Sequence, residues 1–235
     1  MIALVTFFAT TAGISRGASR LPAKNMTQRK VNCAGRTYRY LLYLPPAGGD
    51  LRLPAILLLH GAHGEPSPMI EAWKKLAAKE NIVLMAMEIP SERWFEKAAP
   101  AVFRCEVQDA EQLAPIDAER VSVFGYSMGG YLAYDAAMYD SEFFAAAVVI
   151  SMGIDKDYLG ILNEAKRKIP LAIYTGDSDP LVPVEGVRRT RDILLKNAFP
   201  VHYVEIKHHD HNYFAISDQI NADAWNFVKD KKLPE

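Results

Sequence analysis

Five short apolar runs, almost free of polar residues, most constrain what this chain can fold into. Strands buried on both faces have this character, because helices cover both sides of a parallel sheet. Segments with helical spacing lie between the runs, so strand and helix alternate along the chain. This alternation predicts an α/β fold, with a mostly parallel, doubly wound sheet and helices on both faces. The runs are Ala55–Leu59, Ile82–Met87, Val121–Phe124, Ala145–Ile150 and Leu171–Tyr174.

Further elements complete this pattern. Two more strands are expected nearer the edges of the sheet, at Tyr38–Leu44 and Val201–Ile206. A last helix is expected up to Val228, with Ser217 as its N-cap. In open sheets of this kind, function gathers in the loops that leave the carboxyl ends of the strands.

Length and charge exclude several classes of protein. The chain has 235 residues, of which 50% are hydrophobic, and this suffices for one globular domain, expected at residues 30–235. Lys and Arg number 27 against 28 for Asp and Glu, so the net charge is -1. Such a balance gives no signal for nucleic acid, and no nucleic-acid partner is expected. The oligomeric state stays open.

The first residues resemble a secretory signal. Residues 2–12 are apolar and small, but no Lys or Arg precedes them, which departs from the usual charged start. The run is too short to span a bilayer. Residues 1–20 are therefore either a signal peptide of a secreted or periplasmic protein, or a disordered leader of a cytoplasmic one. Cys33 and Cys105 form one disulfide or stay two free thiols, and export would favour the bridge.

A serine between glycines follows the third apolar run directly. The sequence there is Gly125-Tyr126-Ser127-Met128-Gly129-Gly130, and helical spacing begins at once. This is Gly-x-Ser-x-Gly at a strand-to-helix turn, where small neighbours leave room for a sharp bend that exposes the serine. The alternative is a tight turn with an inert serine. The context favours Ser127 as a nucleophile.

A serine nucleophile needs a base, and a carboxylate that orients the base. For this fold the chain order is serine, acid, histidine. Asp179 lies in the loop after the fifth apolar run and is the expected acid, whereas Asp177 is expected to bond the backbone of that loop. The expected base is His211, farthest into the loop before the last helix. His209 and His208 are the alternatives.

The same histidine loop could bind zinc by residue type, since it holds three histidines and one aspartate within 208–211. That interpretation leaves Ser127 and Asp179 unexplained. Neither a metal nor an organic cofactor is therefore expected.

Acyl transfer also needs donors for the developing oxyanion. The backbone N–H groups of Met128, just after the serine, and of Ala62, in the glycine-rich turn after the first apolar run, are expected to supply them. The neighbouring His60 and His63 are expected to stabilise this loop.

At this point the residues resemble the α/β-hydrolase fold, and within it the compact esterases that include poly(3-hydroxybutyrate) depolymerases, feruloyl and acetyl-xylan esterases and esterase D-like enzymes. The resemblance implies a three-layer α/β-hydrolase fold, carries the acid onto Asp179 and the base onto His211, and implies a small-molecule or polymer-linked ester as substrate. Dienelactone hydrolases have cysteine at the elbow, so Ser127 counts against them. The matching segments are Leu59-His60-Gly61, Ile116–Val121 with the serine motif, Phe143–Ala146, Asp179–Pro183 and Asp210–Tyr213.

The segment Glu88–Arg104 leaves little room for a lid, which favours an open cleft. Its aromatic residues Trp94, Phe95 and Phe103 are expected to line the substrate pocket, together with Tyr213. The expected function is cleavage of carboxylic esters by a Ser-His-Asp triad through an acyl-enzyme. A serine peptidase or amidase of the same fold, and a non-catalytic binding protein on this scaffold, are the alternatives.

Overall fold

The computed structural model covers most of the chain. It describes residues 25–46, 52–89, 99–154 and 158–234. The predicted leader at residues 1–20 lies outside the described residues, and so do Trp94 and Phe95, two of the expected pocket residues. Among the helices that are described, none is long and apolar enough to cross a membrane.

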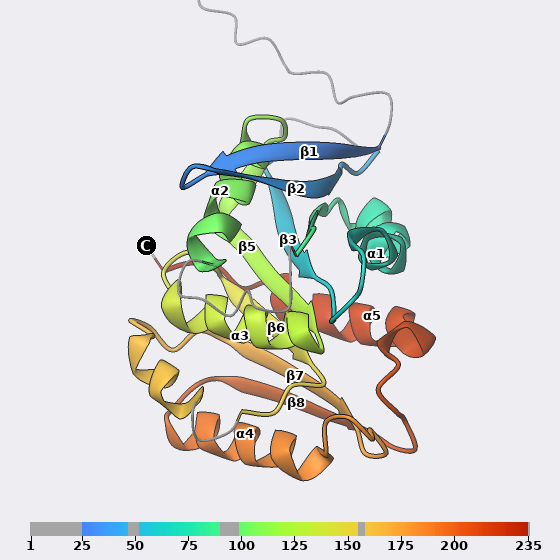
Figure 1. Ribbon diagram of the computed structural model, residues 1–235, viewed down its shortest axis with the longest axis vertical. Coiled ribbons are helices and arrows are strands. Elements are labelled where there is room, and N and C mark those ends of the chain that lie inside the picture. Colours follow the sequence, from blue (N-terminus) through green and yellow to red (C-terminus); the bar gives the residue numbers. More distant parts are fainter. Residues whose placement is uncertain (1–24, 47–51, 90–98, 155–157, 235) are drawn as a thin grey trace, which may run out of the picture.

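One mixed sheet forms the centre of the protein (Figure 1). Its strands are β1 (Met26–Cys33), β2 (Arg36–Tyr43), β3 (Leu53–Leu59), β4 (Val83–Met87), β5 (Ile116–Tyr126), β6 (Ala146–Ile150), β7 (Leu171–Gly176) and β8 (Val201–Ile206). They lie side by side in the order β1-β2-β4-β3-β5-β6-β7-β8. β2 pairs antiparallel with both β1 and β4, and the other neighbouring pairs are parallel. The sheet is therefore mostly parallel, which confirms the predicted fold class.

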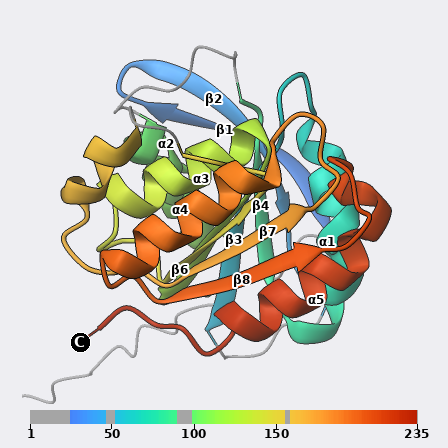
Figure 2. The ribbon, with the colours of Figure 1, turned by 90° about the horizontal axis from the view of Figure 1, so that it is seen from below.

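Helices cover both faces of the sheet. They are α1 (Pro66–Glu80), α2 (Ala99–Glu111), α3 (Met128–Tyr139), α4 (Val184–Lys196) and α5 (Ser217–Val228), with the short 3-10 helices η1 (Tyr158–Glu164) and η2 (Tyr213–Ile216). α1 and α5 pack on one face, whereas α2, α3 and α4 pack on the other (Figure 2). Leu57 and Leu58 of β3 belong to the two different cores, because successive residues of a strand point to opposite faces.

Three local details differ from the prediction. The sequence does not predict β1, because its residues alternate between exposed and half-buried at the edge of the sheet and form no apolar run. β5 begins at Ile116, well before the apolar run at Val121, since Ile116 pairs with Leu53 across a shift in register. Ser217 is not the N-cap of α5. Ile216 takes that position, and the Ser217 hydroxyl donates to a backbone carbonyl instead.

The hairpin of β1 and β2 is tied to α2 by covalent and polar contacts. Cys33 and Cys105 form a disulfide, with their Cα atoms 6.1 Å apart. Asp109 on α2 accepts hydrogen bonds from the Tyr40 hydroxyl at 2.7 Å and from the Arg29 guanidinium at 3.3 Å. The disulfide thus resolves the alternative that the sequence leaves open, and it anchors the edge of the sheet.

Asp135 is a carboxylic acid buried on α3. The residue is only 6% exposed, and its Oδ1 atom has no hydrogen-bond partner among the described residues. Burial raises the pKa of Asp135 to about 7, from an ordinary value of 3.8. When the pH lies between these two pKa values, Asp135 holds a proton in the folded protein and releases it in the unfolded chain. This carboxyl therefore lowers the stability of the fold as the pH rises from acid to neutral.

Asp135→Asn is expected to stabilise the protein more at pH 8 than at pH 5. At pH 8 the wild type carries a buried charge, whereas at pH 5 the folded acid is protonated and resembles the amide. We expect the gain in the free energy of unfolding to be larger at pH 8 by about 1 to 3 kcal/mol. Urea denaturation of both proteins at the two pH values measures it, with the exposed Asp230→Asn as control. An equal gain at both pH values would contradict the argument.

Candidate active site

Ser127 occupies a sharp turn between the end of β5 and the start of α3. Its backbone has φ 56° and ψ -120°, a strained conformation for a residue with a side chain. The Ser127 N–H donates to the Ile150 carbonyl at 2.9 Å, which holds the turn against the end of β6. The turn has the strained backbone that the Gly-x-Ser-x-Gly pattern predicts.

Close backbone contacts explain why glycines flank this serine. A Cβ atom at Gly125 would lie 1.9 Å from the carbonyl oxygen of Gly129. A Cβ atom at Gly129 would lie 2.1 Å from the carbonyl oxygen of Leu59. Both neighbours are backbone atoms, so no side-chain rotation could relieve the clash. The two glycines are therefore required to pack α3 against β5 and β3.

Three side chains from three loops form one hydrogen-bonded chain. Ser127 Oγ lies 2.9 Å from His211 Nε2, and His211 Nδ1 lies 2.7 Å from Asp179 Oδ2. Because an ionised carboxylate only accepts, Nδ1–H donates to Asp179, and Nε2 is left to accept from the Ser127 hydroxyl. The Asp179 side chain is fully buried and that of His211 is 15% exposed. The structure thus brings together the three residues that the sequence predicts, the serine and histidine being 84 positions apart.

Hydrogen bonds hold the Asp179 carboxylate in its ionised form. Burial acts to raise its pKa, but the hydrogen bonds outweigh burial, so the pKa of Asp179 lies below its ordinary value. Oδ1 accepts from two backbone N–H groups at 2.9 Å each, which leaves Oδ2 for the histidine. The donors to this carboxylate are Val182, His211, Leu181 and Ser151.

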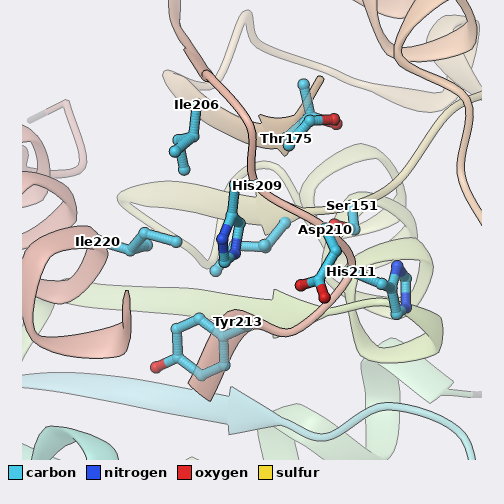
Figure 3. Close-up of a pocket in the computed structure, with 10 residues that line it drawn as sticks. Ser151, Thr175, Ile206, His209, Asp210, His211, Tyr213 and Ile220 are labelled. Atoms are coloured by element: carbon cyan, nitrogen blue, oxygen red, sulfur yellow. The ribbon is translucent and has the colours of Figure 1, made fainter. Parts of the chain in front are cut away.

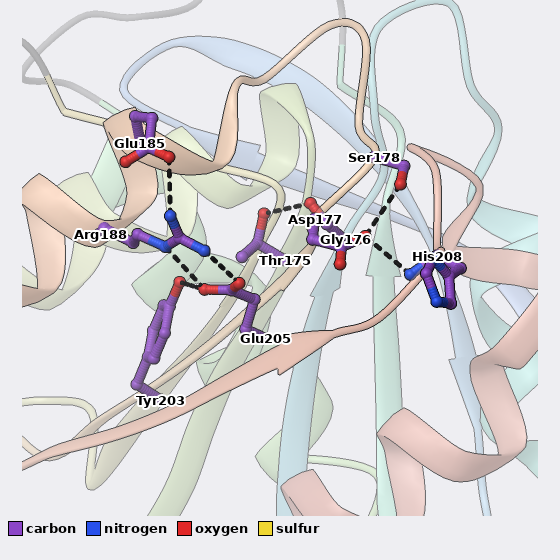
Figure 4. A network of polar contacts seen from close by, with 9 residues as sticks. All are labelled: Thr175, Gly176, Asp177, Ser178, Glu185, Arg188, Tyr203, Glu205 and His208. Carbon is purple, nitrogen blue, oxygen red and sulfur yellow. Dashed lines mark hydrogen bonds and ion pairs between the residues drawn. The ribbon is translucent and has the colours of Figure 1, made fainter.

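The loops after β7 and β8 pack directly against each other. A Cβ atom at Gly176 would lie 2.1 Å from the carbonyl oxygen of His209, and the Ser178 N–H donates to that oxygen at 3.0 Å. Asp177 Oδ1 accepts from the His208 N–H at 2.7 Å (Figure 4). Asp177 therefore bonds backbone, as predicted, but this backbone belongs to the neighbouring loop. The contact fixes the acid loop relative to the histidine loop.

The three histidines of the last loop have different surroundings. His208 is exposed. His209 lines a pocket behind the loop, and its buried Nε2 has no hydrogen-bond partner among the described residues. Figure 3 shows the His209 ring directed toward Ile220, on the other side of the loop from His211. Of the three, His211 is the one whose ring reaches Ser127. Across the described part of the chain, no three His, Cys, Asp or Glu side chains group as they would around a metal ion.

The loop after β3 lies against the nucleophile. A Cβ atom at Gly61 would lie 3.3 Å from the Cβ of Ser127. Within the described residues, the N–H groups of Ala62 and Met128 donate no hydrogen bond to another protein group. Their assignment to the oxyanion stays a prediction.

His60 holds this loop in place. Its buried ring accepts a hydrogen bond at Nε2 from the Ile89 N–H at 3.2 Å, so Nδ1–H donates to the Gly61 carbonyl at 2.8 Å. Burial lowers the pKa of His60, which keeps the ring neutral. These contacts confirm the structural role predicted for His60. The role of His63, which has a left-handed backbone with φ 55°, stays a prediction.

Two of the expected pocket residues belong to the core instead. Phe103 is 0% exposed among the residues that pack under α2 and α3, and Tyr213 is 1% exposed. The Tyr213 hydroxyl donates to Asn221 Oδ1 at 2.7 Å. Neither side chain presents surface to a substrate, so their assignment to the substrate pocket is corrected. Tyr213 instead borders the pocket behind the histidine loop, together with His209 (Figure 3). Large aromatic side chains stabilise the fold most when they are buried, and that preference prevails here.

Sequence reasoning missed two residues at the site. The Tyr126 hydroxyl donates to the carbonyl oxygen of His211 at 2.8 Å. Ser151, which is buried, donates to the Asp179 carboxylate. Both residues stand at or just after the carboxyl end of a parallel strand, and that position is the signal that could have found them.

The fold and this hydrogen-bonded chain define the class of the protein, which is an α/β hydrolase. The sequence profile of the Dienelactone hydrolase family matches residues 53–230. The match covers well over half of the chain, so the chain belongs to this family.

Known proteins with similar sequences or folds agree with this class. NocK of Nocardia uniformis subsp. tsuyamanensis, which is named as a candidate esterase, is 27% identical over 176 residues, or 68% of this chain and 51% of NocK. This chain therefore spans about half the length of that curated relative. A thermostable esterase has a TM-score of 0.71 at 22% identity, over 88% of this chain and 63% of its own. The fluorophosphonate-binding serine hydrolase FphF of Staphylococcus aureus has a TM-score of 0.71 at 19% identity, over 87% and 98%. At these identities, the structures show a shared fold.

Ser127 does not exclude the chain from the dienelactone hydrolases, so that prediction is wrong. That prediction depends on the residue type at one position, whereas the family match extends over residues 53–230. The backbone contacts at Gly125 and Gly129 require small neighbours on either side of position 127, but they do not select which nucleophile stands there. The nearer resemblance to depolymerases, feruloyl esterases and esterase D-like enzymes stays a prediction.

Proposed function

We propose that the protein is a serine hydrolase that cleaves carboxylic esters through an acyl-enzyme. The observation that carries this proposal is the unbroken hydrogen-bonded chain from Ser127 through His211 to Asp179, with distances of 2.9 and 2.7 Å. Membership of the Dienelactone hydrolase family, and a relative named as a candidate esterase, support esters as the substrate class.

In the first half of the reaction, Ser127 Oγ attacks the carbonyl carbon of the ester. The proton of Ser127 passes to His211 Nε2, which already accepts a hydrogen bond from the Ser127 hydroxyl in the resting protein. Asp179 stabilises the resulting imidazolium, and its lowered pKa keeps it ionised for this task. When the tetrahedral intermediate collapses, its bond to the alcohol oxygen breaks. The alcohol leaves with the proton from His211, and the acyl group stays on Ser127.

Two backbone N–H groups stabilise the negative oxygen of the intermediate. They belong to Met128 and Ala62, which donate to no other protein group among the described residues. Preorganised donors of this kind act on charge that develops in the transition state, and losing one costs about 100- to 1000-fold in turnover. The backbone that carries each N–H group is held in place. Met128 begins helix α3, and the buried His60 holds the loop that contains Ala62.

In the second half of the reaction, water replaces the alcohol. His211 removes a proton from the water, whose oxygen attacks the acyl carbon. The bond to Ser127 Oγ then breaks, and the proton returns from His211 to the serine. The carboxylic acid leaves, and every proton that moves is carried by this chain's own residues.

Hydrolysis of a series of p-nitrophenyl esters, from acetate to octanoate, together with methyl ferulate, tests the substrate class. We expect turnover of these esters with an optimum in acyl length, because the size of the acyl pocket sets specificity. Peptide and anilide substrates run in parallel, since the same three side chains can cleave amides. Faster cleavage of the amides would contradict the esterase proposal and favour the peptidase alternative. Failure to hydrolyse any substrate or to react with a fluorophosphonate would favour a binding role.

A further inference from the structure

Tyr126 connects the nucleophile to the histidine loop. It is the last residue of β5 and directly precedes Ser127. Its hydroxyl donates to the carbonyl oxygen of His211 at 2.8 Å. Its ring also lies beside the imidazole, with centroids 5.3 Å apart and the ring planes 42° from each other. One side chain thus contacts both the backbone and the ring of His211.

The surroundings hold the Tyr126 side chain in place and keep it a hydrogen-bond donor. Its ring contacts Tyr213 and Phe214, with centroids 5.4 and 5.8 Å apart. Burial raises the pKa of Tyr126, and the negative charges of Asp179 and Asp210 raise it further. The hydroxyl therefore stays protonated.

The contacts that hold His211 fall into two groups. Its ring is bonded to Asp179 and Ser127, as described above. Its carbonyl oxygen accepts from the Tyr126 hydroxyl at 2.8 Å and from the Tyr213 N–H at 3.0 Å. The Tyr213 contact lies within the histidine loop, whereas the Tyr126 contact comes from the strand that carries the nucleophile. Tyr126 therefore ties the backbone of His211 directly to the strand that ends just before Ser127.

We propose that Tyr126 is a positioning residue, which holds His211 Nε2 at hydrogen-bonding distance from Ser127 Oγ. It acts through the backbone and ring of His211 and itself takes no proton in the reaction. This inference rests on the proposed function, because it assigns a role within the same site. Small displacements of a base lower the rate of proton transfer steeply, so loss of this single hydroxyl affects turnover more than substrate binding.

Tyr126→Phe tests the inference, with Tyr131→Phe as a matched control. Tyr131 lies on α3, and its hydroxyl donates to the carbonyl oxygen of Gly153 at 3.1 Å, so both variants lose one hydroxyl bonded to backbone. We expect Tyr126→Phe to lower kcat for p-nitrophenyl acetate by about 3- to 10-fold, with KM unchanged. The rate of reaction with a fluorophosphonate is expected to fall by a similar factor. Tyr131→Phe is expected to retain the wild-type kcat and labelling rate.

A readout without substrate separates this inference from the proposed function. The proton of His211 Nδ1, bonded to Asp179, is expected to give a low-field signal in proton NMR. We expect this proton to exchange faster with water in Tyr126→Phe than in the control. Unchanged kcat, labelling and exchange in Tyr126→Phe would overturn the inference. Equal losses in both tyrosine variants, or a lowered Tm that accounts for the loss in Tyr126→Phe, would overturn it as well. The proposed function fails separately, if Ser127→Ala retains activity.

Discussion

Ser127→Ala is expected to lower kcat for p-nitrophenyl esters by roughly 10⁴- to 10⁶-fold. The variant is expected to keep the fold, because the substitution removes a single oxygen atom. Among the residues that the structure describes, Ser127 Oγ at 2.9 Å is the hydroxyl that lies at His211 Nε2. The acyl-enzyme cannot form without this oxygen, so labelling by a fluorophosphonate is expected to vanish too. Initial rates across the ester series and mass spectrometry of the labelled protein measure the two effects.

Ser178→Ala provides the matched control for this experiment. Ser178 stands in the acid loop, and its hydroxyl donates to Asp177 rather than to the hydrogen-bonded chain. We expect this variant to retain nearly all activity. The double variant Ser127→Ala/His211→Ala is expected to be little worse than Ser127→Ala alone, because the residues act as a unit. Additive losses, or near-normal activity of Ser127→Ala, would rule out the proposed mechanism.

Cys33→Ser/Cys105→Ser is expected to lower the free energy of unfolding by about 2 to 4 kcal/mol. The disulfide closes a loop with a sequence separation of 72 and ties β1 to α2. Removing it restores conformational freedom to the unfolded chain, and a loop of this length predicts a large effect. In a chain of this size the change corresponds to a fall in Tm of about 5 to 15 °C. Thermal denaturation without reductant measures it.

Reduction of the wild type provides the control. Dithiothreitol is expected to lower the Tm of the wild type toward that of the double serine variant, and to leave the variant unchanged. Below its transition the variant is expected to keep the wild-type kcat, because neither cysteine contacts Ser127, His211 or Asp179 in the described structure. An unchanged Tm in the double variant would contradict the stabilising role of this bridge.

Much of the central sheet can be predicted from the sequence, because its signals are local. Val201–Ile206 is a strand with the predicted bounds, and Ala55–Leu59 lies inside β3. Burial on both faces leaves a continuous apolar run in such strands. The edge strand β1 lacks this signal, since its residues alternate between exposed and half-buried. It is held by the hairpin, the disulfide and the contacts of Asp109, which no local pattern records.

The active site, like the sheet, has some features that local sequence patterns predict and others that they do not. The glycines around Ser127 mark the turn, because backbone contacts forbid any side chain at Gly125 and Gly129. Aromatic residue type, by contrast, does not tell a pocket from a core. Phe103 and Tyr213 are apolar enough for either, and packing buries both.

The doubly wound sheet, the strained turn at Ser127 and the chain order of serine, acid and histidine can all be predicted from the amino-acid sequence alone. Apolar runs and turn residues are patterns among neighbours in the sequence, so they can be recognised without knowledge of the tertiary structure. Two contacts depend on how the loops pack: His211, rather than His208 or His209, reaches Ser127, and the Tyr126 hydroxyl donates to the carbonyl oxygen of His211. These contacts join residues 84 and 85 positions apart. They exist only once β5 and β8 lie in the same sheet and present their carboxyl ends at one edge.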